Sequence, residues 1–315
     1  MSHISSGAVV QVGRDGAVNV LSGAADIGQG AETVISQIVA EELGVPLDDI
    51  RITAADTGIT PLDPGTFGSG VTVRAGNAAR LAAAAAKQKL FNFLADKLEA
   101  NVADLVAKDR QIFVKGSPEK GMTFLEALKA YQYADLPMPI VGRGSWMAPA
   151  DEPTTLFKQD GNFSPNYSFM TQAAEVEVDL ITGQVKLLRM VTAHDCGRPI
   201  NPMLVEGQLE GSVVGGMGQA LYEDVIVQKG QMMNPSFLDY GFPTFLEMPE
   251  IEAIEVETDD PIGPYGAKEA GEGTQLSPAP AIVNAIYDAI GVDFMELPIT
   301  PEKILDALEA KKKEG

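Results

Sequence analysis

Glycine-rich segments recur along this sequence, at residues 28–30, 65–70, 207–218 and 266–273. Each half of the chain has the same order, in which a hairpin or strand is followed by a glycine-rich segment and then by a helix. Glycine allows tight turns and lets a neighbouring group approach the backbone closely. The recurrence therefore predicts a mixed chain of helices and short strands with glycine-rich contact loops.

The remaining pattern predicts an α+β fold of two mixed α/β lobes with short sheets. Alternating and β-branched runs favour strands at residues 8–11, 18–21, 50–54, 111–114, 173–179, 185–193 and 251–257. Helical periodicity favours helices at residues 34–43, 77–98, 124–131, 204–221, 279–290 and 301–311. A long irregular loop is expected at residues 57–76, and a linker at residues 148–166. The predicted lobes are residues 1–150, with the first glycine-rich loops, and residues 151–315, with the last.

The net charge of −21 excludes two classes of partner. A chain this acidic repels the phosphates of nucleic acids and anionic membrane surfaces. No apolar run reaches the roughly 18–20 residues that a membrane span needs. Residues 1–7 lack the basic start and the apolar core of a signal peptide. The expected location is the cytoplasm, with no nucleic acid and no membrane as partner.

Metal-ligating side chains are scarce in this sequence. It has one cysteine, Cys196, and two histidines, His3 and His194. The chain alone therefore forms no internal disulfide and builds neither a four-cysteine zinc or iron–sulfur site nor a histidine-rich metal site.

Two glycine-rich segments in the first half are candidates for ligand contacts. Gly28-Gln29-Gly30 lies before a predicted helix, where backbone N–H groups and the helix dipole favour an anion. For this motif alone, a plain helix-entry turn is the favoured interpretation. Residues 65–70 alternate glycines with hydroxyl side chains around Phe67. Their N–H groups favour a nest for phosphate or another polar ligand, and a flexible exposed loop is the alternative.

The second half has two further candidates. Gly207, Gly211 and Gly215 lie on one face of a predicted helix, beside Gln208. Glycine inside a helix costs up to about 1 kcal/mol relative to alanine, so a close neighbour is expected there. A second helix is the favoured neighbour, and a flat ligand is the alternative. Glu272 lies in a glycine-rich turn, where a carboxylate shielded from water can act as a general base. An exposed turn whose carboxylate pairs with a nearby lysine is the alternative.

Together, these segments resemble one protein family in their order and spacing. Gly28-Gln29-Gly30 comes first, the loop after Gly65 second, Gly207-Gln208 third, and Gly271-Glu272 last. This series resembles the C-terminal half of the molybdopterin-binding subunit in the xanthine oxidase family of molybdenum hydroxylases. The resemblance covers residues 7–310 and implies an α+β fold of the molybdopterin-binding domain type.

The resemblance also implies roles for individual residues. The glutamine of the first segment matches the one beside the metal and the pterin, and the second segment matches the loop that wraps the cofactor with backbone N–H groups. Gln208 matches the glutamine at the pterin end of the cofactor, and Glu272 matches the catalytic glutamate. The metal is held by the cofactor's dithiolene and not by the protein. The implied cofactor-binding residues are Gln29, Gly28, Gly30, Phe67, Gly68, Ser69, Gly70, Val71 and Gln208.

Two departures from the family pattern concern substrate and length. Purine and aldehyde hydroxylases have Gly-Glu-Pro-Pro where this chain has Gly271-Glu272-Gly273-Thr274, a version that most resembles 4-hydroxybenzoyl-CoA reductase. A complete subunit of this family is also more than twice as long. The sequence therefore resembles one polypeptide of a split subunit, as in nicotinate dehydrogenase, or an excised fragment of a longer one.

The resemblance implies an oxidoreductase that is active only with partner subunits. The expected reaction hydroxylates an electron-poor heteroaromatic or aldehyde-type carbon with oxygen from water, and Glu272 takes up the proton. Reductive dehydroxylation of an aryl-CoA is the alternative within the family, and a non-catalytic cofactor-handling or assembly subunit is the alternative of another class. The implied cofactor is Mo-molybdopterin or its cytosine dinucleotide. The implied partners are a second molybdopterin-binding chain, a 2Fe–2S subunit, an FAD subunit and a small aromatic substrate.

Overall fold

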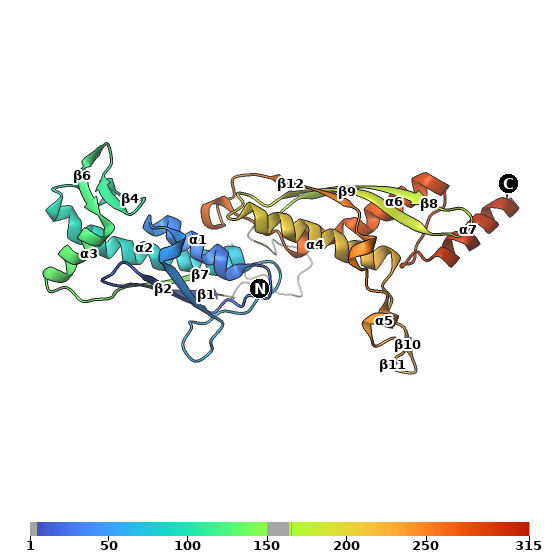
Figure 1. Cartoon of the computed structure of the whole chain (residues 1–315), viewed down its shortest axis with the longest axis horizontal. Helices are drawn as coiled ribbons and strands as arrows, with labels where there is room; N and C mark the ends of the chain where they lie inside the picture. Colours follow the sequence, from blue (N-terminus) through green and yellow to red (C-terminus); the bar gives the residue numbers. More distant parts are fainter. Residues whose placement is uncertain (1–4, 150–163, 165, 315) are drawn as a thin grey trace. The chain divides into compact units, whose positions relative to one another are not determined.

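The computed structural model describes residues 5–149, 164 and 166–314 (Figure 1). The chain divides into two compact units. The first unit comprises Met1–Tyr167 and Asp259–Glu269, and the second comprises Ser168–Thr258 and Ala270–Gly315. The predicted boundary between residues 150 and 151 lies outside the described residues. Because Asp259–Glu269 packs with the first unit, the chain returns to that unit shortly before Glu272.

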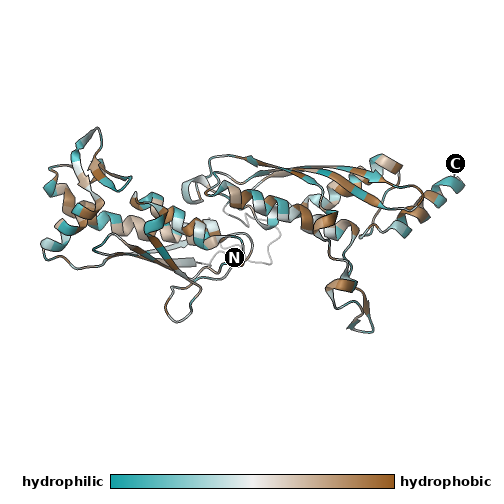
Figure 2. Cartoon of the chain, viewed as in Figure 1, coloured by the Kyte–Doolittle hydropathy of each residue, from teal (hydrophilic) through white to brown (hydrophobic). Residues whose placement is uncertain are grey.

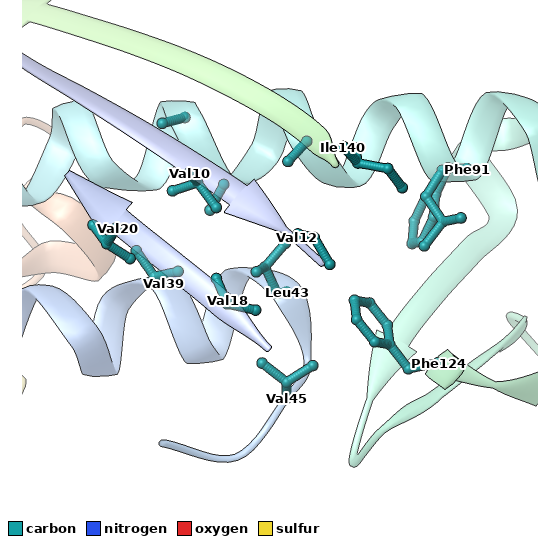
Figure 3. Close-up of a cluster of buried hydrophobic side chains, with 14 of the residues drawn as sticks. Val10, Val12, Val18, Val20, Val39, Leu43, Val45, Phe91, Phe124 and Ile140 are labelled. Carbon is teal, nitrogen blue, oxygen red and sulfur yellow. The ribbon is translucent and has the colours of Figure 1, made fainter. Parts of the chain in front are cut away.

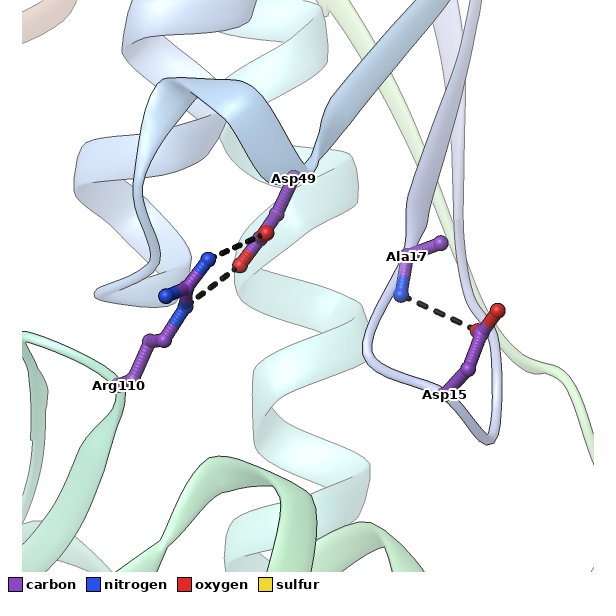
Figure 4. A network of polar contacts seen from close by, with 4 residues as sticks. All are labelled: Asp15, Ala17, Asp49 and Arg110. Carbon is purple, nitrogen blue, oxygen red and sulfur yellow. Dashed lines mark hydrogen bonds and ion pairs between the residues drawn. The ribbon is translucent and has the colours of Figure 1, made fainter.

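The first unit is built on a four-stranded sheet in the order β3-β2-β1-β7. Strand β1 (Ser5–Val12) pairs antiparallel with β2 (Val18–Ser22) and with β7 (Ile140–Met147), and β2 pairs parallel with β3 (Ile50–Ala54). The predicted first hairpin is confirmed. At its turn the backbone N–H of Ala17 donates to the carboxylate of Asp15 over 3.2 Å (Figure 4). The pairing places the alternate residues of β1 on the buried face of the sheet.

Two helices, α1 (Ala31–Leu43) and α2 (Val71–Lys97), pack on this sheet. A Cβ atom at Gly142 or Gly144 of β7 would run into backbone atoms of α2, so strand and helix pack almost backbone to backbone. The alanines of α2 leave room for this approach, and most of those on its inner face are buried. The alanine-rich stretch of the sequence is therefore a helix built for close contact with β7.

The start of α2 corrects one expectation. Residues 71–76 are helical, although the sequence predicts an irregular stretch up to residue 76. Valine, threonine and glycine are poor helix formers, which is why the pattern favours a loop there. In the fold, Gly76 is buried where Ile38 and Pro264 come close, and a Cβ atom at Gly76 would lie 2.8 Å and 3.1 Å from them. Tertiary packing outweighs the weak local propensity.

The core of the first unit lies between its sheet and its helices (Figure 3). Valines of β1 and β2 contribute one wall, and α1, α2 and α3 (Phe124–Tyr133) contribute the others. A second sheet joins β4 (Leu105–Lys108), β5 (Gln111–Val114) and β6 (Ser117–Thr123). The guanidinium of Arg110, at the β4–β5 turn, donates to both carboxylate oxygens of Asp49 over 2.6 Å and 2.9 Å (Figure 4).

The second unit has a three-stranded sheet in the order β12-β9-β8. Strand β9 (Val185–Asp195) pairs antiparallel with β8 (Met170–Val178) and parallel with β12 (Glu250–Val256). Helices α4 (Pro202–Leu221) and α6 (Pro278–Ile290) share a core with the sheet, and α7 (Pro301–Glu314) ends the described chain. Between α4 and β12 lie β10 (Val227–Gln228), β11 (Gln231–Met232) and α5 (Phe237–Tyr240).

The α+β prediction is confirmed, with short sheets and helices in both units. Among the described residues, no helix combines the length and the apolar character needed to cross a bilayer.

Candidate functional site

Gln29 lies in the turn that enters α1, and that turn fixes its side-chain amide. The amide oxygen accepts the backbone N–H of Ile27 over 2.7 Å, and the amide nitrogen donates to the carbonyl of Ala25 over 3.2 Å. An amide nitrogen carries two hydrogens, so one further donor remains for a ligand. The turn therefore holds Gln29 in one orientation with one N–H to offer.

The backbone N–H groups at the start of α1 are bound by a carboxylate of this same chain. The Asp26 carboxylate accepts the N–H groups of Gly28 over 2.8 Å and of Glu32 over 3.2 Å. Partial burial raises the pKa of Asp26, but these bonds, together with those from Gly30 and Ala31, outweigh it and hold the pKa below its usual value. The anion expected at this helix start is therefore Asp26 of the chain itself.

The second glycine-rich segment lies against the Gln29 turn. The hydroxyl of Thr66 donates to the carbonyl of Ala25 over 2.5 Å, the same carbonyl that accepts the Gln29 amide. The N–H of Gly65 donates to the carboxylate of Asp63 over 2.9 Å, which shapes the entry to the loop. The fold thus brings together two segments that the sequence places far apart.

Bare backbone is exposed in both of these segments. Gly28 and Gly68 have φ values of 104° and 54°, a left-handed conformation that strongly favours glycine. A Cβ atom at either position would meet nothing within 4 Å. The open space beside this backbone fits a ligand that packs against it, as the resemblance implies for molybdopterin.

Gly70 has a different explanation, which depends on Arg74. A Cβ atom at Gly70 would collide with the Arg74 guanidinium. That guanidinium donates to the carbonyls of Phe67 over 3.1 Å and Gly65 over 3.4 Å, and it lies 4.7 Å from the centre of the Phe67 ring. Burial lowers the pKa of Arg74, and nearby Asp63 opposes the shift. Arg74 therefore shapes the loop. Sequence reasoning missed it, although an arginine four residues after Gly70 was a usable signal.

In the second unit, two hydroxyl groups connect the backbone carbonyl of Gln208 with that of Gly271, the residue before Glu272. The Ser212 hydroxyl lies 2.7 Å from the carbonyl oxygen of Gln208 and 3.3 Å from that of Gly271. The Thr274 hydroxyl lies 2.5 Å from the Ser212 oxygen and 2.9 Å from the Gly271 carbonyl. Because each hydroxyl carries one hydrogen, the two groups share these acceptors. The arrangement fixes the peptide directly before Glu272 to the helix that carries Gln208.

This network continues to the sheet of the second unit. The Gln172 amide on β8 donates to the Thr192 hydroxyl over 2.7 Å and to the Thr274 carbonyl over 3.1 Å. Thr274 and Thr192 are fully buried. Thr274 stands where the family pattern has proline, which has no hydroxyl, so the departure from the pattern has a structural role here.

Glu272 begins the 3-10 helix η5 (Glu272–Leu276) and is exposed. The second unit by itself therefore does not shield the Glu272 carboxylate from water. Glu269, three residues earlier, belongs to the first unit.

The glycine face of α4 is only partly covered. A Cβ atom at Gly207 or Gly211 would meet nothing within 4 Å, whereas Gly215 lies against the side chain of Gln275. Within the described residues of the second unit, no helix packs against Gly207 and Gly211 as the pattern favours. Bare helix backbone is therefore exposed next to Gln208, which fits a flat ligand there.

The segment that precedes Glu272 is anchored in the first unit. Tyr265, with a φ of 54°, donates its hydroxyl to the Glu42 carboxylate over 3.0 Å. Burial, together with the charge of Glu42, raises the pKa of Tyr265. The Asn77 amide donates to the Ile262 carbonyl over 2.8 Å. These contacts with α1 and α2 restrain Asp259–Glu269, and sequence reasoning missed them.

Cys196 is the one cysteine of the sequence, and it is buried. Burial, with the charges of Glu255 and Asp195, raises the pKa of its thiol to about 11. Within the described ranges, no three side chains of His, Cys, Asp or Glu are grouped so that they could hold a metal ion.

Comparison with known proteins identifies the family. Residues 1–249 match the family model of the molybdopterin cofactor-binding domain. The chain is 34% identical over 306 residues to the xanthine dehydrogenase molybdenum-binding subunit of Escherichia coli O157:H7, a match that covers 96% of this chain and 39% of that protein.

The chain belongs to the molybdopterin cofactor-binding domains of the xanthine dehydrogenase family. A second relative is the gamma subunit of the 6-hydroxypseudooxynicotine dehydrogenase complex of Paenarthrobacter nicotinovorans, 36% identical over 96% of this chain and 38% of the relative. The crystal structure of quinoline 2-oxidoreductase from Pseudomonas putida 86 superposes with a TM-score of 0.86 and 32% identity, over 97% of this chain and 38% of that one.

These comparisons confirm the resemblance that the four ordered motifs indicate. The molybdopterin-binding domain described here spans about two-fifths of the length of the curated relatives it matches.

Proposed function

We propose that this domain is part of a multi-subunit oxidoreductase that hydroxylates an electron-poor heteroaromatic or aldehyde-type carbon with oxygen from water. Relatives named for xanthine, quinoline and 6-hydroxypseudooxynicotine support this class of substrate. The observation that carries the proposal is the Ser212–Thr274 hydroxyl pair, which holds the peptide before Glu272 against the helix of Gln208.

Each unit, taken by itself, has residues that we propose for cofactor contacts. In the first unit, Gln29 offers its second amide N–H, and Gly28 and Gly68 offer bare backbone. In the second unit, Gln208 lies beside the exposed backbone of Gly211. The chemistry that a bound molybdenum cofactor would supply is acceptance of the electrons that leave the substrate. The protein's own contribution is to orient the cofactor and to move protons.

Glu272 is the proposed general base. Its carboxylate accepts a proton as oxygen from water is transferred to the substrate carbon. Because Glu272 is exposed in this chain, we propose that a partner polypeptide completes the pocket and excludes water there. The hydrogen bonds to the Gly271 carbonyl hold the backbone from which the Glu272 side chain extends, which supports a defined position for this residue.

A second candidate reaction is reductive dehydroxylation of an aryl-CoA, in which Glu272 donates a proton. The observation that favours it is the run Gly271-Glu272-Gly273-Thr274, which differs from the Gly-Glu-Pro-Pro of purine and aldehyde hydroxylases. The hydrogen bonds of Thr274 are common to both candidates, so the assay with aryl-CoA thioesters distinguishes them.

The proposed partner subunits follow from the single cysteine of this sequence, which is too few to bind an iron–sulfur cluster. Iron–sulfur clusters of this family are held by cysteine thiolates, so this sequence does not supply their ligands. We propose a second molybdopterin-binding polypeptide, a 2Fe–2S subunit and an FAD subunit. The choice between molybdopterin and its cytosine dinucleotide is part of the same proposal.

Elemental and cofactor analysis of the intact purified complex tests this function. Molybdenum is expected in equal number to this chain, with iron and FAD on other subunits. Turnover is then assayed with N-heteroaromatics, aldehydes and aryl-CoA thioesters. A turnover-competent complex without molybdenum would overturn the proposal. Molybdenum without turnover on any of the three classes would favour a cofactor-handling subunit instead. The isolated chain is expected to lack molybdenum.

A further inference from the structure

Residues 223–247 of the second unit form an arm that leaves the end of α4 and leads back to β12 (Figure 1). The arm contains the two-residue strands β10 and β11, the single turn of α5 and the 3-10 helix η3 (Phe245–Glu247). No residue of this arm belongs to the buried core of the second unit. The shape of the arm must therefore come from other interactions.

Polar contacts supply that shape. Asn234 is only 5% exposed, and its amide oxygen accepts the Ile226 N–H over 3.0 Å while its amide nitrogen donates to the Asp224 carbonyl over 2.7 Å. Further along, the Tyr240 hydroxyl donates to the Glu223 carboxylate over 3.0 Å. These bonds connect the outgoing and returning segments of the arm. A segment that is organised in this way has a defined surface before any partner binds.

That surface is apolar. Phe237, Leu238, Phe245 and Leu246 are 81%, 92%, 88% and 87% exposed, and α5 is coloured as hydrophobic in Figure 2. Single exposed apolar residues are ordinary, but several large ones on one short segment mark an interaction site. The hydrogen bonds of Asn234 and Tyr240 stay within the arm, whereas these four apolar side chains face outward.

We infer that this arm is the docking site for the rest of the molybdenum-binding subunit, whether that polypeptide is a separate chain or continuous with this one. The inference rests on the proposed function. The relatives align with 96% of this chain, so the aligned part includes nearly all of it, and the match covers only 38–39% of their own length. Their remaining polypeptide is the largest body of protein expected beside the arm.

The apolar and acidic side chains of the arm fit the rest of the molybdenum-binding subunit as its binding partner. Permanent interfaces resemble a domain core cut in half and are more apolar than transient ones. Four large apolar side chains that are each more than four-fifths exposed match a permanent interface. The acidic side chains of the arm, among them Asp224, oppose a nucleic acid or an anionic membrane as the occupant.

Site-specific photocrosslinking in the intact complex tests the inference. The photoreactive residue p-benzoylphenylalanine replaces Phe245, and in a control complex it replaces Ile181, which is 87% exposed at the β8–β9 turn of the same unit. Crosslinked peptides are then sequenced by mass spectrometry. At position 245 they are expected to come from the rest of the molybdenum-binding subunit, and at position 181 they are not.

Three crosslinking results would overturn the inference. These are attachment of position 245 to a second copy of this chain, attachment to the iron–sulfur or FAD subunit, and no attachment at all in a complex that has its full molybdenum. Because molybdenum is measured on the same samples, a complex without metal counts against the proposed function and not against the arm.

A substitution supplies the second measurement. Where the rest of the subunit is a separate chain, Phe245→Asp combined with Leu246→Asp is expected to weaken its association at least about tenfold, since buried aromatic anchors dominate interface energies. Ile181→Asp is the matched control and should leave association unchanged. The thermal midpoint of the chain itself should stay the same in both variants, because the arm lies outside the core.

Discussion

The hydroxyl oxygen of Thr274 lies 2.5 Å from that of Ser212, and both are within 3.3 Å of the carbonyl oxygen of Gly271. The residue after Gly271 is Glu272, the proposed general base. A position at which the chain departs from its family's pattern therefore supports the peptide that carries the catalytic candidate. The contact also connects α4 with the η5 turn, across 62 residues of sequence.

Removing this hydroxyl should affect both stability and turnover. Thr274→Val keeps the side-chain volume but leaves buried acceptors without their donor, which typically costs about 1–3 kcal/mol. We expect a lower thermal midpoint and a reduced kcat, with molybdenum content retained. Thr182→Val removes an exposed turn hydroxyl and is the control. Equal midpoints and turnover for the two variants would show that the hydroxyl pair does not support the turn.

Glu272→Gln tests the proposed base directly. Glutamine keeps the size and the hydrogen-bonding shape of glutamate but cannot accept the proton. General acid–base catalysis typically contributes about 10²–10⁴ in rate, so turnover should fall by that factor while molybdenum content stays the same. The measurements are kcat and metal content on the same preparation.

Glu269→Gln is the internal control for this experiment, because Glu269 lies three residues away and belongs to the first unit. A milder effect is expected there. If Glu269→Gln is the inactive variant, the assignment of the base along this turn is wrong by three residues.

Gly68→Val tests the loop that is proposed to contact the cofactor. Valine brings a side chain into the open space beside this backbone and strains a left-handed conformation. Cofactor content, measured as molybdenum per chain, should be lost. Gly116→Val is a close control, because Gly116 also has a positive φ and nothing within 4 Å of a Cβ position, in the turn between β5 and β6. Similar losses of molybdenum in both variants would indicate strain alone and no cofactor contact.

The raised pKa of the Cys196 thiol predicts that the stability of the folded chain depends on pH in the alkaline range. Its pKa is raised from 9.0 to about 11 by burial in the folded chain. Above about pH 9 the unfolded chain releases the thiol proton while the folded chain keeps it. Stability therefore falls as the pH rises from about 9 to about 11, and the contribution of this group is unchanged below pH 9. Cys196→Ser should remove that part of the pH dependence of thermal unfolding.

Alkylation with iodoacetamide checks the same residue at about pH 8, where an ordinary thiol is partly ionised. The folded chain should react slowly and the urea-unfolded chain quickly, because the thiolate is the nucleophile and burial also blocks access. Fast modification of the folded chain would contradict the buried placement of the thiol.

Several helices, strands and turns of this fold are determined by local patterns in the sequence. The hairpin around Asp15, the helix ended by Gly44 and the strands of the second unit were predictable, because turn dipeptides, helix stops and alternation act between near neighbours. The order of the four motifs also identified the family, which the comparisons confirm. The roles of Gln29, Gln208 and Glu272 stay predictions.

Only the tertiary structure decided the features that join distant segments. Strand β7 was missed because two glycines lower its strand propensity, and those glycines are needed for contact with α2. Arg74 over Phe67, Tyr265 on Glu42 and the pairing of Thr274 with Ser212 likewise depend on which elements become neighbours. Sequence periodicity indicates which face of a helix or strand is buried, but it does not indicate which other element packs against that face. The contacts named above join residues that become neighbours only after the chain has folded.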